Sequence, residues 1–239
     1  MSDKVVPINP RLIARRPVIE LSEDALALNF INDEGDYLRY DHSRGAWFIW
    51  VGRHWQQDET GDTFEAIREY CAKFGASQTK PADQKRLSSV KHAKAIETFA
   101  AVDRRAAVTA RHWDKHPFLL ATPEGTVNLR TGELREARPE ELMSRITAVG
   151  PSEPGDECPL WMQFLDEACA SSAAQIRFLQ KTCGYSLTGD TREHALFFVY
   201  GPGGNGKSVM LNVLTGILNA YAITAPMEIF TASKNERHS

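Results

Sequence analysis

The sequence lacks the cysteine pairs that a zinc module or a disulfide framework needs. Its four cysteines, Cys71, Cys158, Cys169 and Cys183, form no Cys-x-x-Cys pair and no zinc-knuckle spacing. Free thiols in a reducing compartment are their expected state. The chain also has no apolar run near 18 residues and no signal-peptide core at its start. We therefore expect a cytoplasmic protein with no membrane partner.

Catalytic motifs are scarce as well. No convincing paired-aspartate catalytic motif is present, and Asp33–Asp36 is expected to be a turn. His112 and His116 are four residues apart, but no third ligand lies nearby in the sequence, so a metal site is not expected. Hydrolysis of a nucleoside triphosphate needs an acidic residue after an apolar strand, and none follows Ser208. We therefore assign no catalytic residue within the chain.

Positive charge is in the minority overall but is concentrated in one stretch. The chain has 28 Lys and Arg against 31 Asp and Glu, a net charge of −3, which argues against a uniformly basic nucleic-acid coat. Residues 80–116 nevertheless hold nine basic against four acidic residues. Apolar residues at helical spacing predict helices here with a basic opposite face: Leu87, Val90, Ile96, Phe99 and Val102. That face is either solvated or contacts nucleic-acid phosphates. The candidate DNA contacts are Lys85, Arg86, Lys91, Lys94, Arg104 and Arg105.

The first 75 residues contain a leader, a small sheet and a helix. Residues 1–21 hold three prolines and predict a flexible leader, whose arginines either touch phosphates or belong to an unstructured tail: Arg11, Arg15 and Arg16. Three short β-prone runs in residues 37–57 predict an antiparallel meander. Its aromatic side chains either stack on bases or, as we favour, form a core. Asp62 and Glu65 predict the start of a helix that Gly75 ends.

The middle of the chain predicts hairpins and then a domain boundary. Turn residues at 122–125 and 130–133 predict two hairpins within residues 119–136, and residues 146–149 favour a last strand. Residues 151–156 are typical of a linker, which separates a domain at 22–150 from one at 157–239. Helices are expected around Trp161–Ala168 and Ile176–Cys183, the second stopped at Gly184.

A glycine-rich loop is the most informative stretch. Residues 195–200 are a continuous apolar run that predicts a strand buried on both faces of a parallel sheet, and residues from 208 to about 219 recur at helical spacing. Glycine backbone amides between them can turn inward around a phosphate, Lys207 supplies charge for the β- and γ-phosphates, and the Ser208 hydroxyl can ligate Mg²⁺. The predicted nucleotide-binding residues are Gly201, Pro202, Gly203, Gly204, Asn205, Gly206, Lys207 and Ser208.

Several stretches together resemble one family, the primase-helicases of phages, satellite phages and plasmids. The resemblance is carried by these motifs: Phe118–Gly125, Asn128–Leu134, Trp161-x-x-Phe164-Leu165, Gly184–Gly189 and Gly201–Ser208. In that family a region shared with poxvirus nucleoside triphosphatases precedes a superfamily 3 helicase domain. The resemblance implies an α+β N-terminal domain of hairpins and helices, followed by the first part of an α/β P-loop domain of the AAA+ type. It also implies ATP and Mg²⁺ as cofactors, single-stranded DNA as partner and a hexameric ring of the complete protein.

Two departures from the family limit the expected activity. Fewer than about 30 residues precede the resemblance, so priming is not expected, and the helicase half ends soon after the glycine loop. We therefore expect an N-terminal portion of a helicase that binds nucleotide weakly and hydrolyses little. A non-hydrolysing module that binds DNA or a replication partner is the alternative. A small-molecule kinase is disfavoured because little chain follows the loop to form an acceptor site or lid.

Overall fold

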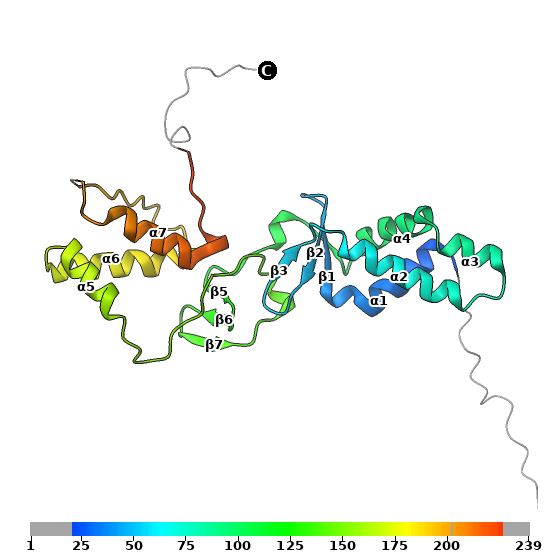
Figure 1. The fold of residues 1–239 in the computed structure, drawn as a ribbon, viewed down its shortest axis with the longest axis horizontal. Helices are drawn as coiled ribbons and strands as arrows, with labels where there is room; N and C mark the ends of the chain where they lie inside the picture. Colours follow the sequence, from blue (N-terminus) through cyan, green and yellow to red (C-terminus); the bar gives the residue numbers. More distant parts are fainter. Residues whose placement is uncertain (1–20, 202, 227–239) are drawn as a thin grey trace, which may run out of the picture. The chain divides into compact units, whose positions relative to one another are not determined.

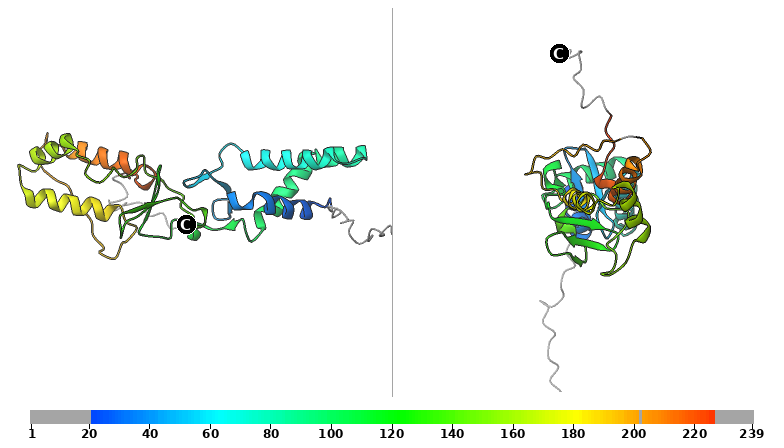
Figure 2. Two further views of the ribbon diagram at one scale, coloured as in Figure 1. Left: turned by 90° about the horizontal axis from the view of Figure 1, so that it is seen from below. Right: turned by 90° about the vertical axis from the view of Figure 1, so that its left-hand side faces the viewer.

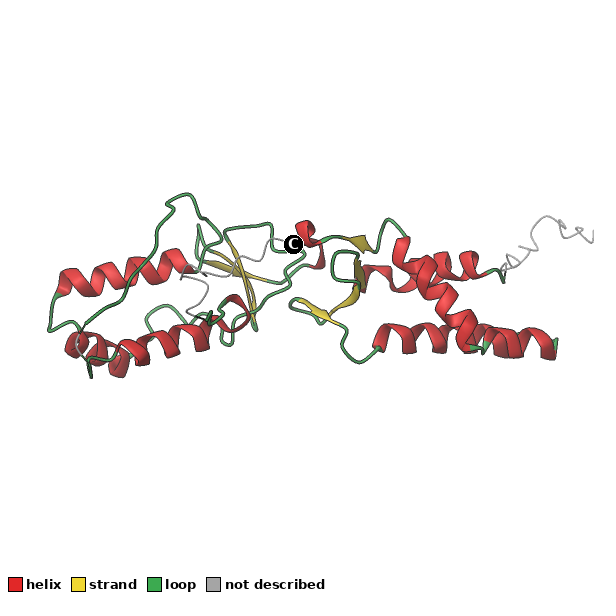
Figure 3. Cartoon of the chain, turned by 90° about the horizontal axis from the view of Figure 1, so that it is seen from above, coloured by secondary structure: helices red, strands yellow, loops and turns green. Residues whose placement is uncertain are grey.

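The computed structural model describes residues 21–201 and 203–226 (Figure 1). Within these ranges the chain is an α+β protein with seven α-helices and two small sheets (Figure 3). Packing divides it into two compact units, Met1–Arg39 with Glu59–Ala107 (unit 1) and Tyr40–Asp58 with Val108–Ser239 (unit 2). All but the last residue of the predicted leader, including its three arginines, lies outside the described residues. No helix of the described part is long and apolar enough to cross a membrane.

Unit 1 is a helical unit built around α1. Its helices are α1 (Glu23–Glu34), α2 (Asp62–Ala76), α3 (Pro81–Leu87) and α4 (Val90–Val102), with a 3₁₀ turn, η2 (Gly35–Tyr37), after α1. α1 packs on α4, and α2 packs on both α3 and α4. Ser22 and Ser89 cap α1 and α4 by accepting hydrogen bonds from the N–H groups of Ala25 and His92. The fully buried side chains are Leu26, Phe30, Ile67, Leu87 and Ile96.

The sequence predicts α2, α3 and α4, but it assigns the wrong side chains to the buried face of α4. The predicted helix at 62–75 is confirmed as α2, although Gly61 rather than Asp62 is its N-cap. Of the five apolar residues expected on the buried face of α3 and α4, Leu87 and Ile96 are buried. The other three are exposed, to 70% (Val90), 45% (Phe99) and 58% (Val102).

The face of α4 that is buried runs through His92, Ala93, Ile96 and Ala100, because small side chains let α1 approach closely. α1 was not predicted, and the expected turn at 33–36 is instead the end of this helix and the start of η2. The packing of α1, a helix that the sequence does not predict, therefore determines which face of α4 is buried.

The first sheet has the strand order β3-β2-β1-β4 and a core of aromatic rings. Its strands are β1 (Leu38–Asp41), β2 (Ala46–Trp50), β3 (Trp55–Gln57) and β4 (Ala107–Val108). The predicted meander is confirmed as β1 to β3, and β4 is an addition. The cluster at the core consists of Phe48, Trp55, Val108 and Trp113. Of the aromatic residues of the predicted meander, Trp47, Phe48 and Trp55 are buried core residues, whereas Tyr37 is 54% exposed.

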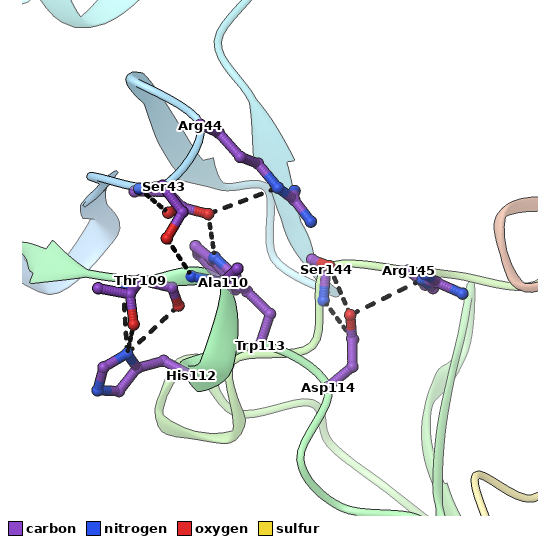
Figure 4. Close-up of polar contacts among 10 residues, drawn as sticks. Ser43, Arg44, Thr109, Ala110, His112, Trp113, Asp114, Ser144 and Arg145 are labelled. Carbon is purple, nitrogen blue, oxygen red and sulfur yellow. Dashed lines mark hydrogen bonds and ion pairs between the residues drawn. The ribbon is translucent and has the colours of Figure 1, made fainter. Parts of the chain in front are cut away.

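A buried carboxylate organises the turn between β1 and β2 (Figure 4). Asp41 is fully buried, and its Oδ1 accepts a 2.8 Å hydrogen bond from the Ser43 amide. Its Oδ2 accepts a 2.9 Å hydrogen bond from Trp113 Nε1 and lies 3.5 Å from Arg44 Nε. A second carboxylate, Asp114, accepts hydrogen bonds from both the amide and the hydroxyl of Ser144. Burial of Asp41 is therefore compensated by local donors and by Trp113, while the half-buried Asp114 accepts hydrogen bonds from Ser144, 30 positions away.

The second sheet is a three-stranded meander with the order β5-β6-β7. β5 (Leu119–Thr122) pairs antiparallel with β6 (Gly125–Asn128), which pairs with β7 (Glu133–Arg135). Both predicted hairpins are confirmed. Gly125 has φ 154°, and a Cβ there would lie 2.2 Å from the carbonyl oxygen of Arg135, so the close approach of β7 requires glycine.

Residues 146–149 are not a strand, contrary to the prediction. Only Thr147 bonds to the sheet, through its N–H and the Ala121 carbonyl at 3.0 Å. Two short 3₁₀ turns, η3 (Ala110–His112) and η4 (Pro139–Glu141), complete this part of unit 2.

Three helices follow the predicted linker, in the part of the chain coloured from yellow-green to red in Figure 2. They are α5 (Pro159–Ala168), α6 (Ala173–Ser186) and α7 (Lys207–Leu218), with a 3₁₀ turn, η5 (Asn219–Tyr221), after α7. The sequence predicts all three helices, but α6 continues past Gly184, where it was expected to stop. A Cβ at Gly184 would have no heavy atom within 4 Å, so the surroundings do not force the helix to end there. Residues 151–156 are exposed and contain no helix or strand, and the domain boundary placed there stays a prediction.

Residues 195–200 are not a strand, and this prediction is wrong for the described chain. The exposed fractions alternate along the run, 81% at Leu196, 41% at Phe197 and 80% at Phe198, as along an extended backbone. A strand requires hydrogen bonds to a neighbour, and no described residue provides them, because residues 222–225, the other candidate, are also not a strand. The α+β part of the predicted fold is thus observed, whereas no parallel sheet is present among the described residues.

Candidate phosphate-binding site

The glycine loop lies between the extended run and α7, and its backbone takes positive φ at Gly204 and Gly206, as expected, but at Gly201 rather than at Gly203. Gly201, Gly204 and Gly206 have φ values of 153°, 76° and 79°, in the region that favours glycine. Gly206 is the N-cap of α7, and its carbonyl accepts the first helical hydrogen bond, from the Met210 N–H at 3.0 Å. Pro202 lies outside the described residues. The loop therefore leads directly into the amino end of a 12-residue helix, whose first amides have no helical acceptor.

Lys207 reaches back across the loop. Its Nζ donates hydrogen bonds to the Gly201 carbonyl oxygen at 3.1 Å and to Asn205 Oδ1 at 2.5 Å. Sequence reasoning gave Asn205 no role of its own, whereas the structure places its side-chain oxygen on the lysine ammonium. Gly201 and Asn205 thus hold the ammonium of Lys207 across the loop. A phosphate that enters the loop would meet this ammonium at the amino end of α7.

The aromatic ring of Phe164, on α5, packs against the loop. A Cβ at Gly206 would lie 2.7 Å from Cε2 of Phe164, so the glycine lets the ring pack directly under the turn. Phe164 stacks on Trp161 with ring centroids 5.2 Å apart. The sequence placed Phe164 on the apolar face of a helix but carried no signal that this face would meet the loop, because the contact joins segments about 40 residues apart.

Ser208 is exposed in the first turn of α7, one residue after Lys207. Its hydroxyl is the expected Mg²⁺ ligand, and the chemistry of this donor fits, since Mg²⁺ takes oxygen ligands and keeps several waters when it binds a nucleotide. No group of three or more His, Cys, Asp or Glu side chains within the described ranges forms a separate metal site. His112 instead lies in η3, where its Nδ1 bonds to the Thr109 amide. The Mg²⁺ assignment therefore stays a prediction that depends on bound nucleotide.

An apolar groove of about 640 Å³ borders the loop. It is lined by α5, α6, α7 and the extended run, and its wall includes Asn205, Gly206 and Lys207. Burial raises the pKa of the Cys183 thiol in this wall, so the thiol stays protonated at neutral pH and is no nucleophile. The groove thus joins apolar surface directly to the loop.

The six candidate DNA contacts lie on or just after α3 and α4 of unit 1, and all six are exposed. Three of them have partners. Lys94 Nζ lies 2.5 Å from Glu97 Oε2, Arg105 Nη2 lies 2.7 Å from Asp103 Oδ2, and Arg86 donates to the Leu21 carbonyl. The other three, Lys85, Lys91 and Arg104, have no hydrogen bond or ion pair within the described part of the chain. These three side chains are thus available to an outside anion, while the paired ones are partly neutralised.

Comparison with known protein families gives one match. Residues 23–170, more than half of the chain, match the family model described as D5 N terminal like, a primase/helicase-associated N-terminal domain. The match begins at the first residue of α1, includes both sheets and α5, and ends before α6 and the glycine loop. The chain has no significant match among curated protein sequences.

Proposed function

The chain belongs to the D5 N terminal like family, and from this membership and the glycine loop we propose that it is the nucleotide-binding, N-terminal portion of a replicative superfamily 3 helicase. The family is associated with replicative primase-helicases, which supports a replication role. The loop supports the nucleotide: three glycines at positive φ lead into α7, with Lys207 across the opening. The proposal depends on one observation: the glycines with positive φ and the side chain of Lys207 lie together at the amino end of α7.

The proposed ligand is Mg·ATP, held by the main chain more than by side chains. Amides of Gly203, Gly204 and Gly206 surround the phosphates, Lys207 neutralises the β- and γ-phosphates, and Ser208 ligates Mg²⁺. Mg²⁺ at Ser208 would supply positive charge that offsets the negative charge of the phosphates. The proposal assigns binding to this chain and only slow hydrolysis. It extends to single-stranded DNA as partner and to a ring of copies for the working helicase.

A titration with a fluorescent ATP analogue tests the proposal. Lys207→Ala removes a charge-assisted hydrogen bond to phosphate and is expected to raise the Kd about tenfold or more. Lys181→Ala is the matched control, because Lys181 is an exposed lysine on α6 that does not line the groove. Equal affinity of the wild type and Lys207→Ala, or no binding at all, would refute a phosphate-binding loop.

An adaptor that binds nucleic acid without using ATP is the second candidate. It is favoured by the three exposed cations of unit 1 that lack acidic partners: Lys85, Lys91 and Arg104. A titration of single-stranded DNA binding against salt separates the two functions. Binding that survives Lys207→Ala, has a steep salt slope and weakens on Lys91→Ala supports the adaptor. Binding that is lost with nucleotide binding supports the helicase portion.

A further inference from the structure

The carboxyl end of α7 is tied to the second sheet, although its amino end carries the loop. Directly after α7, Asn219 has φ 48° and ψ −114°, a backbone conformation that is strained for any residue except glycine. Its side chain donates to the Ile146 carbonyl at 3.3 Å, a contact that spans 73 positions in the sequence. A strained residue persists only where its surroundings hold it, so this hydrogen bond marks a fixed point of α7.

The segment of residues 146–149, here called the strap, lies between α7 and the sheet. The Ala148 N–H donates to the Ile217 carbonyl at 2.9 Å, which satisfies one of the last carbonyls of the helix. On its other side the Thr147 N–H donates to the Ala121 carbonyl of β5 at 3.0 Å. Thr147 is almost fully buried, and its hydroxyl donates to the Val149 carbonyl at 2.7 Å. The strap thus bonds to the helix and to β5 through neighbouring residues.

Tyr221 makes the same connection directly. Its hydroxyl oxygen accepts a 3.1 Å hydrogen bond from the Ala121 N–H, 100 positions away. Burial, with a smaller contribution from Asp114, raises the pKa of Tyr221 to about 12, so the phenol is neutral when it accepts this bond. Ala121 points both main-chain groups away from β6, one to Tyr221 and one to Thr147. The outer edge of β5 is therefore occupied by the strap and the end of α7.

The opposite end of α7 is held by side-chain packing rather than by main-chain hydrogen bonds to a sheet. Met210, near the loop, is the one buried residue of the helix, and the run that precedes the loop has no main-chain hydrogen bond within the described residues. Lys207 must exchange its contacts to Gly201 and Asn205 for phosphate oxygens when a nucleotide binds. A helix fixed at one end transmits a change at the other end, because its own hydrogen bonds keep it rigid.

We propose that the strap and Tyr221 couple the glycine loop to the β5–β6–β7 sheet, so that a nucleoside triphosphate bound at the loop tightens the attachment of α7 to β5. The two-state element is Asn219, strained and bonded to Ile146 in one state and relaxed in the other. This coupling rests on the proposed nucleotide binding. Linkage makes it reciprocal: a variant that loosens the attachment weakens nucleotide binding by the same factor.

Hydrogen exchange on the 239-residue chain, with and without saturating Mg·ATP, tests the coupling. In the wild type, ATP is expected to slow exchange about fivefold in residues 119–122 and 146–149, the lower end of measured couplings. Tyr221→Phe removes the acceptor of the Ala121 amide, so exchange there is faster without ATP and the Kd for ATP rises about fivefold. Tyr37→Phe is the matched control, since Tyr37 is 54% exposed in unit 1.

Each outcome decides the proposal. An ATP-bound wild type with unchanged exchange, or Tyr221→Phe with wild-type ATP affinity, overturns the coupling and leaves nucleotide binding intact. No ATP binding by the wild type refutes the proposed function and, with it, the coupling. If Tyr221→Phe fails to fold, Asn219→Ala gives the same test, because it removes the bond to Ile146 and leaves Tyr221 in place. Asn219→Gly, which relieves the strain, must then weaken ATP binding less than Asn219→Ala.

Discussion

The helices of unit 1 and the three helices after residue 157 differ in how much of their apolar surface they bury. α1, α2 and α4 each bury four or five residues, whereas α5 and α7 bury one each and α6 buries none. Large apolar side chains of the later helices are exposed, 80% at Leu160 and 57% at Phe178. Burial of apolar surface is the main favourable term in folding, so the stability of the described chain resides in its earlier part. The later helices are positioned by a few hydrogen bonds instead.

Among the variants that test this contrast, Trp55→Ala is expected to lower the free energy of unfolding most. Its side chain is fully buried in the aromatic cluster, and its Nε1 donates to the Pro139 carbonyl at 2.9 Å. Trp55→Ala is expected to lower the free energy of unfolding by about 3 to 5 kcal/mol, through lost burial and a cavity. Urea unfolding followed by circular dichroism measures it. A loss below about 1 kcal/mol would show that the cluster does not carry the stability.

Asp41 is expected to give the next largest effect. Asp41→Ala leaves the buried Nε1 of Trp113 without an acceptor and frees the turn at Ser43, which costs about 1 to 3 kcal/mol. Asp36→Ala is the control, because Asp36 is exposed. The same urea titration applies, and equal midpoints for the two variants would contradict the role given to the buried carboxylate.

The glycine loop offers a test in the weakly packed region. Gly206→Ala places a Cβ at φ 79° and 2.7 Å from Phe164, which costs about 1 to 2 kcal/mol and predicts a roughly tenfold higher Kd for the ATP analogue. Gly216→Ala is the control, because its Cβ meets no atom within 4 Å and alanine favours a helix. Similar affinities for both variants would mean that the loop geometry does not determine binding.

A pH titration probes His54, near the first sheet. Burial lowers the pKa of His54, against an opposing effect of Asp114, and its Nδ1 is buried with no hydrogen-bond partner among the described residues. The unfolded state therefore binds a proton more readily than the native state. The contribution of neutral His54 to stability is full above the unfolded pKa of about 6.5 and is lost as pH falls below it.

His54→Gln is expected to flatten this dependence. Urea midpoints between pH 8 and pH 5 measure it in both proteins. A wild-type midpoint that rises as pH falls would contradict the sign.

The smallest effect is expected at Leu160. Leu160→Ala removes a side chain that is 80% exposed in the first turn of α5, and the expected change is within about 0.5 kcal/mol. A loss comparable to that of Trp55→Ala would break the contrast, since it would show that α5 is as firmly packed as the aromatic cluster of the first sheet.

Local signals were sufficient for the hairpins and for α2, α5 and α7. Turn residues such as Gly125 and Gly132 fix where strands reverse, and the glycines of the loop fix where the backbone takes positive φ. The sequence motif singles out Lys207 for the phosphates, which stays a prediction, but its contacts with Gly201 and Asn205 across the loop were not predicted. These features depend on neighbours within a few residues.

Features that depend on distant partners were missed. α1 carries Leu26, Ala27, Phe30 and Ile31 on one face, after the cap residue Ser22, and both signals were present but weak beside the turn residues at 33–36. The run at 195–200 has strand composition, but strand formation needs a second chain segment, and no described segment pairs with it. The contacts of Gly206 with Phe164 and of Tyr221 with Ala121 leave no local trace in the sequence.

The position of Lys207 sets a threshold for what the loop accepts. Its ammonium already has two oxygen partners, Gly201 O and Asn205 Oδ1, so an incoming anion competes with acceptors that the loop itself supplies. A chloride or a single sulfate replaces few of these contacts, whereas a polyphosphate offers several oxygens at once and also meets the glycine amides. If the loop binds a nucleotide as proposed, selectivity for longer phosphate chains follows from this internal competition.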